Sequence, residues 1–234
     1  LAFSYLVQEQ GHEAIYQLTC RDRNRLALQS DLLSAWVLGL ENVLALTGDH
    51  TSLGDHPEAQ PVFDLDSTQL LDVINRLNSG MDLADNKLKG NTDFFAGAAI
   101  NPGAEPLEKE IKKSLKKSRN GAKFFQSQPV YETEIFSDFI KKLRKAGVDQ
   151  PVIIGVLPLK SPEMAKYMND NIPGIYVPEE IIRKLEESSD TVRVSTDISA
   201  RIIKETRPIC EGIHLMPLGW ENYIPEILKK ADII

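Results

Sequence analysis

The chain has few cysteines, no long apolar run and no excess of basic residues, and each shortage excludes a class of protein. Two cysteines in 234 residues argue against a disulfide scaffold and are typical of a reducing cytosol. No apolar run approaches the roughly 18 residues that a membrane-spanning helix needs. The formal net charge is −7, whereas a protein that binds the phosphate backbone of nucleic acid needs a basic surface. We therefore expect a cytoplasmic protein that binds neither membranes nor nucleic acid.

What the chain does contain is a repeated alternation of strand and helix. Short apolar runs, several of which begin a few residues after a glycine, are typical of strands buried on both faces. Six such runs are predicted, at residues 15–18, 42–46, 94–98, 123–126, 152–156 and 213–216. The length of 234 residues is sufficient for a substantial core without disulfide or metal cross-links.

Segments between these runs have the apolar spacing of helices. The clearest covers residues 106–119, where Pro106 suits the first helical position and the charges change from acidic to basic along the segment. For the helix near residues 26–37, one buried face is predicted. Its members are Leu26, Leu32, Leu33, Trp36 and Val37.

Strand–helix alternation predicts an α/β protein with a parallel sheet. No Gly-x-Gly-x-x-Gly motif follows the early strands, so a (βα)8 TIM barrel fits better than a Rossmann fold. Eight strands are needed and six are found, and the chain starts at Leu1 inside an apparent helix. We expect a single barrel domain over residues 1–234 that carries strands three to eight and lacks the first two strands.

Polar residues follow four of the predicted strands, at the end where a barrel carries its active site. After one strand, Gly48 allows close approach to the backbone, and Asp49 follows with a carboxylate that can bind a ring N–H or stabilise a developing cation. The alternative is that Asp49 caps the next loop. After another strand, the Gln128 amide can donate to and accept from a heterocycle edge, or satisfy loop backbone groups.

For other polar residues, two roles are possible. The run Arg21-Asp22-Arg23 can bind phosphate or form a local ion-pair network, with equal support for both. Lys116 and Lys117 are either a solvated helix end or a contact to a diphosphate.

Neither a nucleophile nor a metal site is predicted. Cys20 is expected to be a small buried residue. His50 and His56, each of which follows an aspartate, match no common zinc spacing.

Five segments in order resemble the methylenetetrahydrofolate reductase family, a group of flavin-dependent (βα)8 barrels. They are Gln17-Leu18-Thr19-Cys20, residues 42–49, residues 97–102, residues 121–128 and Gly155-Val156-Leu157-Pro158. The resemblance covers nearly the whole chain from about residue 10. Residues 20–24 and 219–221 resemble those of the family branch that is found in acetogens and related anaerobes.

The resemblance implies reduction of 5,10-methylenetetrahydrofolate to 5-methyltetrahydrofolate through bound FAD, in one-carbon metabolism and methionine biosynthesis. It places Asp49 near flavin and folate, as a catalytic and substrate-binding residue, and Gln128 on the folate. The flavin contacts that it implies are Gln17, Thr47, Gly48, Asp49, Asp64, Ile100, Asn101, Lys116 and Lys117. Gln17 stands where many members have His, and Trp220 where the bacterial methionine-pathway enzymes have Arg.

The family's general acid is a glutamate on strand one, and the resemblance implies that this strand is missing here. NADH or NADPH is the implied electron donor, although an electron-donating partner subunit or a fused methyltransferase domain is also implied for this branch, together with an oligomer. Two other interpretations stay open. One is a flavin-independent barrel that binds folate or pterin and transfers methyl groups, and the other is a non-catalytic subunit of a larger complex.

Overall fold

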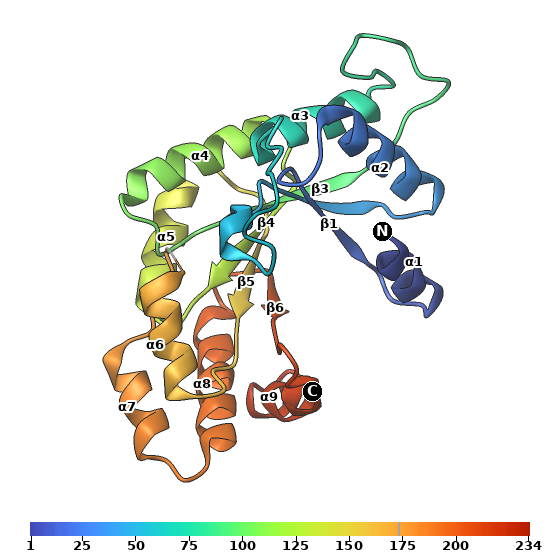
Figure 1. Cartoon of the computed structure of the whole chain (residues 1–234). Coiled ribbons are helices and arrows are strands. Elements are labelled where there is room, and N and C mark those ends of the chain that lie inside the picture. The colour runs from blue at the N-terminus through green and yellow to red at the C-terminus, as the bar shows by residue number, and fades with distance from the viewer. Residues whose placement is uncertain (173) are drawn as a thin grey trace. The chain divides into compact units, whose positions relative to one another are not determined.

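The computed structural model describes residues 1–172 and 174–234, which form two compact units (Figure 1). The first unit contains Leu1–Ala99 and Lys116–Phe124, and the second contains Ile100–Leu115 and Phe125–Ile234. Both units are built from parallel strands and helices. The predicted α/β alternation is therefore confirmed, whereas membership of an eight-stranded barrel and of one domain stays a prediction.

In the first unit, parallel strands follow one another in chain order. β1 pairs with β2 from Ile15↔Asn42 to Thr19↔Leu46, and β2 pairs with β3 from Asn42↔Phe95 to Ala45↔Ala98. The elements are α1 (Ala2–Glu9), β1 (Ile15–Thr19), α2 (Arg25–Val37), β2 (Asn42–Leu46), a 3-10 turn (Thr51–Leu53), α3 (Ser67–Asn78) and β3 (Phe95–Ile100). Because parallel strands end at the same edge, β1 and β2 bring the residues that follow them close together.

Burial on α2 differs from the prediction. The residues of α2 that are buried are Leu28, Leu32 and Ala35, whereas Leu26 and Val37 are 74% and 84% exposed. Leucines occur on opposite sides of this helix, so apolar spacing alone could not distinguish the face that meets the sheet.

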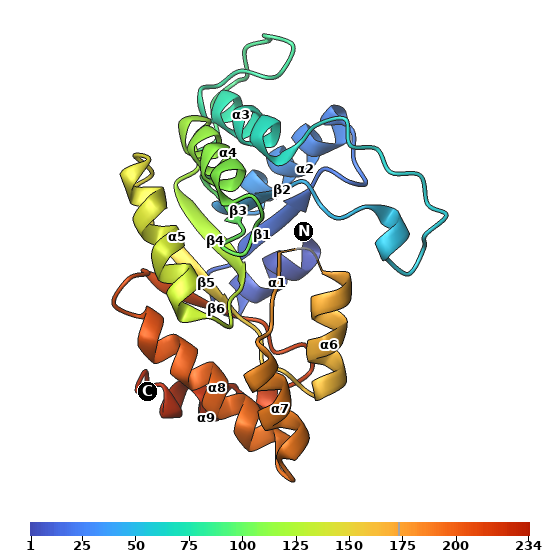
Figure 2. The same ribbon diagram turned by 90° about the vertical axis from the view of Figure 1, so that its left-hand side faces the viewer.

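In the second unit, β5 pairs in parallel with both β4 and β6. Helix α8 packs on β5 and contacts α5 and α9 (Figure 2). The elements are β4 (Phe124–Pro129), α5 (Thr133–Lys145), β5 (Val152–Val156), α6 (Pro162–Asn171), α7 (Glu179–Glu187), α8 (Thr191–Thr206), β6 (Gly212–Leu215), a 3-10 turn (Glu221–Tyr223) and α9 (Ile224–Lys230).

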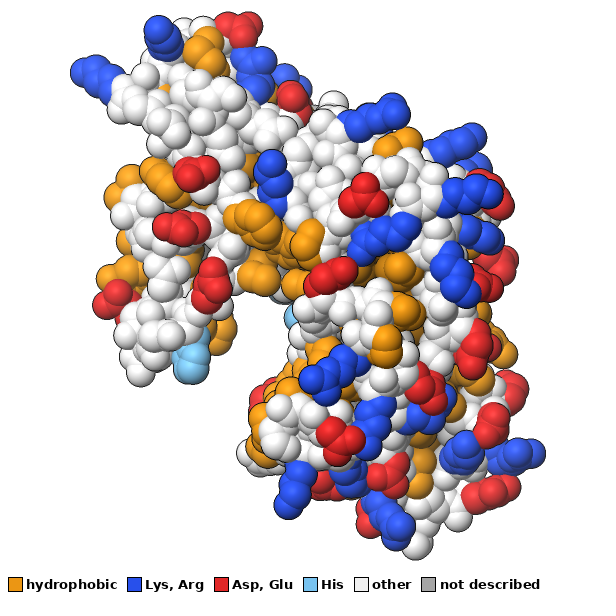
Figure 3. All heavy atoms as spheres, turned by 180° about the vertical axis from the view of Figure 1, so that it is seen from behind, with side chains coloured by type: hydrophobic (Ala, Val, Ile, Leu, Met, Phe, Trp, Pro, Cys, Tyr) orange, Lys and Arg blue, Asp and Glu red, His pale blue; other side chains and the backbone are white. Residues whose placement is uncertain are grey.

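The clearest predicted helix is α4 (Leu107–Arg119), which begins one residue after Pro106. Its acidic residues, Glu108 and Glu110, lie in the first turn, and Lys116, Lys117 and Arg119 lie in the last turn, as predicted. Among the described residues, no helix is long and apolar enough to span a membrane. On the face that Figure 3 shows, acidic side chains lie among the basic ones.

Candidate functional site

In the first unit, the residue that follows β2 is hydrogen-bonded to the start of α3. Thr47 Oγ1 donates to Ser67 Oγ at 3.1 Å and accepts from the Ser67 backbone N–H, also at 3.1 Å. The next residue, Gly48, has a φ of +87°, and a Cβ on it would lie 3.0 Å from Arg21 Cβ. Glycine therefore serves two purposes here, since it allows the left-handed backbone and the close approach of the loop after β1.

Asp49 follows this turn as an exposed residue. Its negative charge contributes to raising the pKa of Arg21, although the larger cause is the hydrogen bond from that guanidinium to Asp22. Two bonds join Arg21 to Asp22, with Nε–Oδ1 at 2.7 Å and Nη2–Oδ2 at 3.0 Å. Arg23 donates to Asp31 at 2.6 Å. The ion-pair interpretation of this run is therefore confirmed.

Gln17 lies on the exposed face of β1. Burial alternates along this strand, so that Tyr16 and Leu18 are buried while Ile15 and Gln17 are exposed. The amide of Gln17 is therefore accessible to a ligand on that face of the first unit.

The predicted flavin residue Asp64 has a partner that the sequence did not reveal. Arg25 binds both of its carboxylate oxygens, with Nη2–Oδ1 and Nε–Oδ2 each at 2.9 Å, and the Arg25 backbone N–H adds a bond of 2.8 Å. The side-chain hydrogen bonds and the backbone bond lower the pKa of Asp64 to about 2. The two residues are 39 apart in the chain, so no local spacing could have indicated the pair.

The two lysines at the end of α4 have different environments. Lys116 is exposed, whereas Lys117 is 3% exposed and its Nζ donates to the carbonyl oxygen of Ala99 at 2.6 Å. For Lys117, the solvated-end interpretation is wrong, because its aliphatic stem lies in the core while its ammonium reaches the carboxyl end of β3.

Cys20 is fully buried, as predicted. Burial, with a smaller contribution from the charge of Asp66, raises the pKa of its thiol to about 11. Such a thiol is a poor nucleophile at neutral pH. No group of three or more His, Cys, Asp or Glu side chains able to hold a metal occurs among residues 1–172 and 174–234.

In the second unit, Ile100 is buried and Asn101 is half-buried at the end of β3. The Asn101 backbone N–H donates to Glu110 Oε1 at 3.1 Å, and its side-chain Oδ1 accepts from the Gly103 N–H at 3.0 Å. Asn101 lines a cavity of about 500 Å³ with Gly103, Ala104, Glu105, Gly174, Ile175 and Tyr176. These bonds fix Asn101 in the wall of the cavity, where a ligand can reach it.

Gln128 is exposed on β4, and its neighbour Ser127 ties that strand to β5. The Ser127 hydroxyl donates to the Gln128 backbone carbonyl at 2.8 Å and accepts from the Gly155 N–H at 2.9 Å. A Cβ on Gly155 would lie 2.6 Å from the Ser127 carbonyl oxygen, so this close contact requires glycine. The backbone of Gln128 is fixed while its side chain stays accessible.

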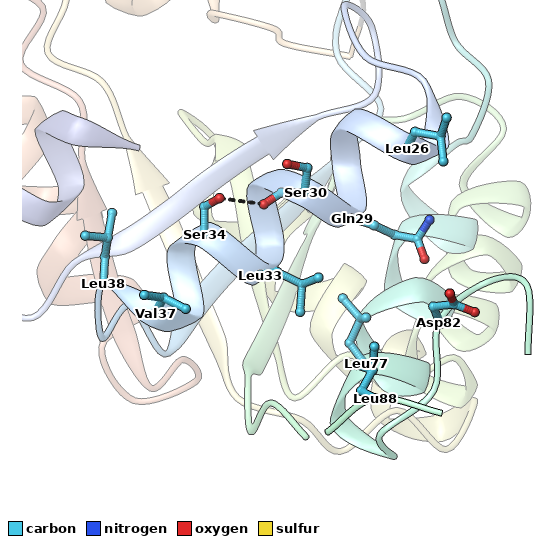
Figure 4. Close-up of a pocket in the computed structure, with 10 residues that line it drawn as sticks. All are labelled: Leu26, Gln29, Ser30, Leu33, Ser34, Val37, Leu38, Leu77, Asp82 and Leu88. Carbon is cyan, nitrogen blue, oxygen red and sulfur yellow. Dashed lines mark hydrogen bonds between the residues drawn. The ribbon is translucent and has the colours of Figure 1, made fainter. Parts of the chain in front are cut away.

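A further cavity in the first unit lies away from these strand ends. It is a groove of about 710 Å³ between α2 and α3, walled by exposed leucines of α2 and by Leu77 and Leu88 (Figure 4). None of its lining residues is among those predicted to bind substrate or cofactor, and its α2 residues lie on the side opposite Leu28 and Leu32.

Comparison with known proteins identifies the family. The family model for methylenetetrahydrofolate reductase matches residues 2–232. The chain belongs to the methylenetetrahydrofolate reductase family. Its relatives include a probable methylenetetrahydrofolate reductase (NADPH) of Caenorhabditis elegans, 28% identical over 95% of this chain and 33% of that protein. Methylenetetrahydrofolate reductase 2 of Schizosaccharomyces pombe is 24% identical, over 97% of this chain and 37% of that protein.

A bacterial relative, the 5,10-methylenetetrahydrofolate reductase of Salmonella typhimurium, is 24% identical over 68% of this chain and 49% of its own length. The chain thus spans about a third to a half of the length of these methylenetetrahydrofolate reductases. Among solved structures, an uncharacterized Clostridium thermocellum protein, described as binding two copies of 5-methyl-5,6,7,8-tetrahydrofolic acid, aligns with a TM-score of 0.46. It is 17% identical over 96% of this chain and 97% of its own.

Proposed function

We propose that this chain is part of a methylenetetrahydrofolate reductase that reduces 5,10-methylenetetrahydrofolate to 5-methyltetrahydrofolate. The observation that carries the proposal is the family match over residues 2–232, which includes every residue predicted for the site. The proposed reaction adds a hydride to the methylene carbon and yields a methyl group. It assigns the enzyme to the oxidoreductases of one-carbon metabolism and methionine biosynthesis.

The substrate residues of the proposal are Asp49 and Gln128. Opening of the methylene bridge creates a cationic substrate, and an exposed carboxylate at the end of β2 stabilises such a charge. An amide such as that of Gln128 can both donate to and accept from the edge of a pterin ring. By resemblance to the family, a glutamate on the first strand of the barrel supplies the proton for the ring nitrogen, and we assign that role to no residue of this chain.

The residues present fit FAD in three respects. Gly48 offers bare backbone at a strand end, the Gln17 amide is exposed, and Lys116 is an exposed cation at the end of α4. We assign flavin contacts to Thr47, Asp49, Ile100, Asn101, Lys117 and Asp64 as well. When bound, the flavin supplies a hydride acceptor and donor, and the residues of this chain orient it and balance its diphosphate charge.

The remaining parts of the proposal follow the family. Relatives from Caenorhabditis elegans and Arabidopsis thaliana are named for NADPH and NADH, respectively, so we propose a nicotinamide donor or an electron-donating partner subunit. We also propose that the strands belong to one (βα)8 barrel domain, that the protein is cytoplasmic, and that it forms oligomers.

Flavin content and its response to folate test the proposal. The full-length protein that contains this chain should purify yellow, and anaerobic addition of 5-methyltetrahydrofolate should bleach the flavin, because the reverse reaction reduces it. Colourless protein that takes up no added FAD would contradict the proposal. Methyl transfer to a corrinoid protein without any flavin would support the methyltransferase interpretation instead.

A further inference from the structure

A short segment of the first unit, residues 62–64, is tied at both ends to the loop and helix that follow β1. At one end, the Val62 N–H donates to the Arg21 carbonyl oxygen at 2.7 Å. At the other end, Arg25 holds Asp64 through two guanidinium bonds of 2.9 Å and one backbone bond of 2.8 Å. The residue between these two attachments is Phe63.

Phe63 has an unusual backbone. Its φ is +42°, in the left-handed region that bulky residues seldom occupy. Such a conformation is unfavourable and persists where the surrounding structure holds it. The bonds on both sides of Phe63 are suited to that task, since they fix the residues before and after it.

The ring of Phe63 in turn contacts the loop after β2. It stacks on the imidazole of His50, with ring centroids 6.3 Å apart and an angle of 24° between the rings. His50 is the residue directly after Asp49. A continuous set of contacts therefore runs from the Arg25–Asp64 pair through Phe63 and His50 to the segment that carries Asp49.

We propose that Arg25 is a positioning residue, which holds Asp64 so that Phe63 supports the loop carrying Asp49. This role rests on the proposed function of Asp49. It also gives Asp64 a role beside the proposed flavin contact, because both oxygens of its carboxylate are bound by Arg25.

Exposed ion pairs usually contribute little to stability, so the geometry of this pair matters. Arg25 binds the carboxylate through two guanidinium nitrogens, and such a bidentate pair fixes the orientation of both groups as well as attracting them.

A nearby pair provides a matched control. Arg23 binds Asp31 through Nε at 2.6 Å, from the same stretch of chain and with a comparable part of both side chains exposed.

Hydrogen exchange measures this role without requiring catalysis. In the full-length protein, Arg25→Ala and Asp64→Asn should each raise amide exchange over residues 60–66 by about tenfold, since charge-assisted hydrogen bonds are lost and the segment opens more often. Arg25→Lys, which keeps the charge without the fork, should give an intermediate rate. Arg23→Ala should leave exchange in this segment within about twofold of wild type.

A kinetic measurement on the flavin-loaded protein completes the test. Arg25→Ala should lower kcat at least about fivefold with flavin content and KM near wild type, because a displaced catalytic carboxylate slows the reaction more than binding. Arg25→Lys should recover part of that loss. Unchanged exchange in Arg25→Ala, an equal increase in Arg23→Ala, or increased exchange with unchanged kcat would each overturn the positioning role. Absence of flavin would overturn the proposed function, while the exchange result would still decide whether Arg25 fixes the segment.

Discussion

The contact between Gly97 and Phe124 provides a sharp test of the packing in the first unit. A Cβ on Gly97 would lie 2.2, 2.4 and 2.5 Å from three carbons of the Phe124 ring. That ring is 4% exposed and stacks on Phe95 with centroids 5.6 Å apart. Displacement of this ring would also disturb its stacking on Phe95.

Gly97→Ala should destabilise the protein by about 1–3 kcal/mol, the usual cost of excess volume in a packed core. Alanine restricts the unfolded chain more than glycine does, which offsets about 0.5–1 kcal/mol of that cost. The net cost of about 0.5–2 kcal/mol should lower the melting temperature by roughly 1–8 °C for a chain of this size. Thermal unfolding followed by far-UV circular dichroism measures the change.

Two further variants identify the cause. In a Phe124→Leu background, the cost of Gly97→Ala should fall below about 0.5 kcal/mol, since the ring that the new methyl group meets is gone. Gly212→Ala is the strand control, because its Cβ would lie 3.5 Å from Ile153, an ordinary contact. A Gly97→Ala variant that melts like wild type, or whose cost is the same with leucine at position 124, would show that the Phe124 ring does not restrict this position.

Four other predictions concern single residues. Asn24→Ala removes the side chain that caps α2 through two backbone N–H groups, and should cost about 1 kcal/mol in chemical denaturation; an unchanged midpoint would contradict the cap. Tyr131→Phe deletes a 2.9 Å bond from a buried hydroxyl to a backbone carbonyl, with an expected cost of about 1 kcal/mol in the same assay. Because burial raises the pKa of Cys20 to about 11, its thiol should stay protonated and unreactive with a disulfide reagent at pH 8 in a Cys210→Ser background, and react only on unfolding. Asp49→Asn should lower turnover about 100-fold or more while leaving the melting temperature unchanged, since the side chain is exposed; a large loss of stability would show that the residue has a structural role.

Much of the strand pattern could be predicted because the strands are short apolar runs bounded by glycine or polar residues. The predicted bounds of β2 and β5 agree with the structure at both ends. On α2, Leu32 is buried as predicted, but Leu26 and Val37 are exposed, since leucines lie on two sides of that helix and only the sheet determines which side is covered. Amphipathic spacing is informative only when one side is polar.

The arrangement around the candidate site depends on contacts between residues far apart in the chain. Asp64 was predicted, but its partner Arg25 was not, because a pair 39 residues apart leaves no periodic signal. Lys117 was expected either at a solvated helix end or on a diphosphate, and its burial could not be inferred from the surrounding lysines. Residue types at strand ends predict candidates, whereas packing determines which of them reach a ligand.

Under the proposed function, a hydride moves between flavin and the one-carbon group of a folate. A single-turnover comparison of 5-methyltetrahydrofolate carrying CH3 or CD3 tests this transfer, with flavin bleaching as the signal under anaerobic conditions. The proposal predicts slower bleaching with CD3, because a C–H bond of the methyl group breaks in that step. Transfer of an intact CD3 group to an acceptor, with no change in flavin absorbance, would contradict it.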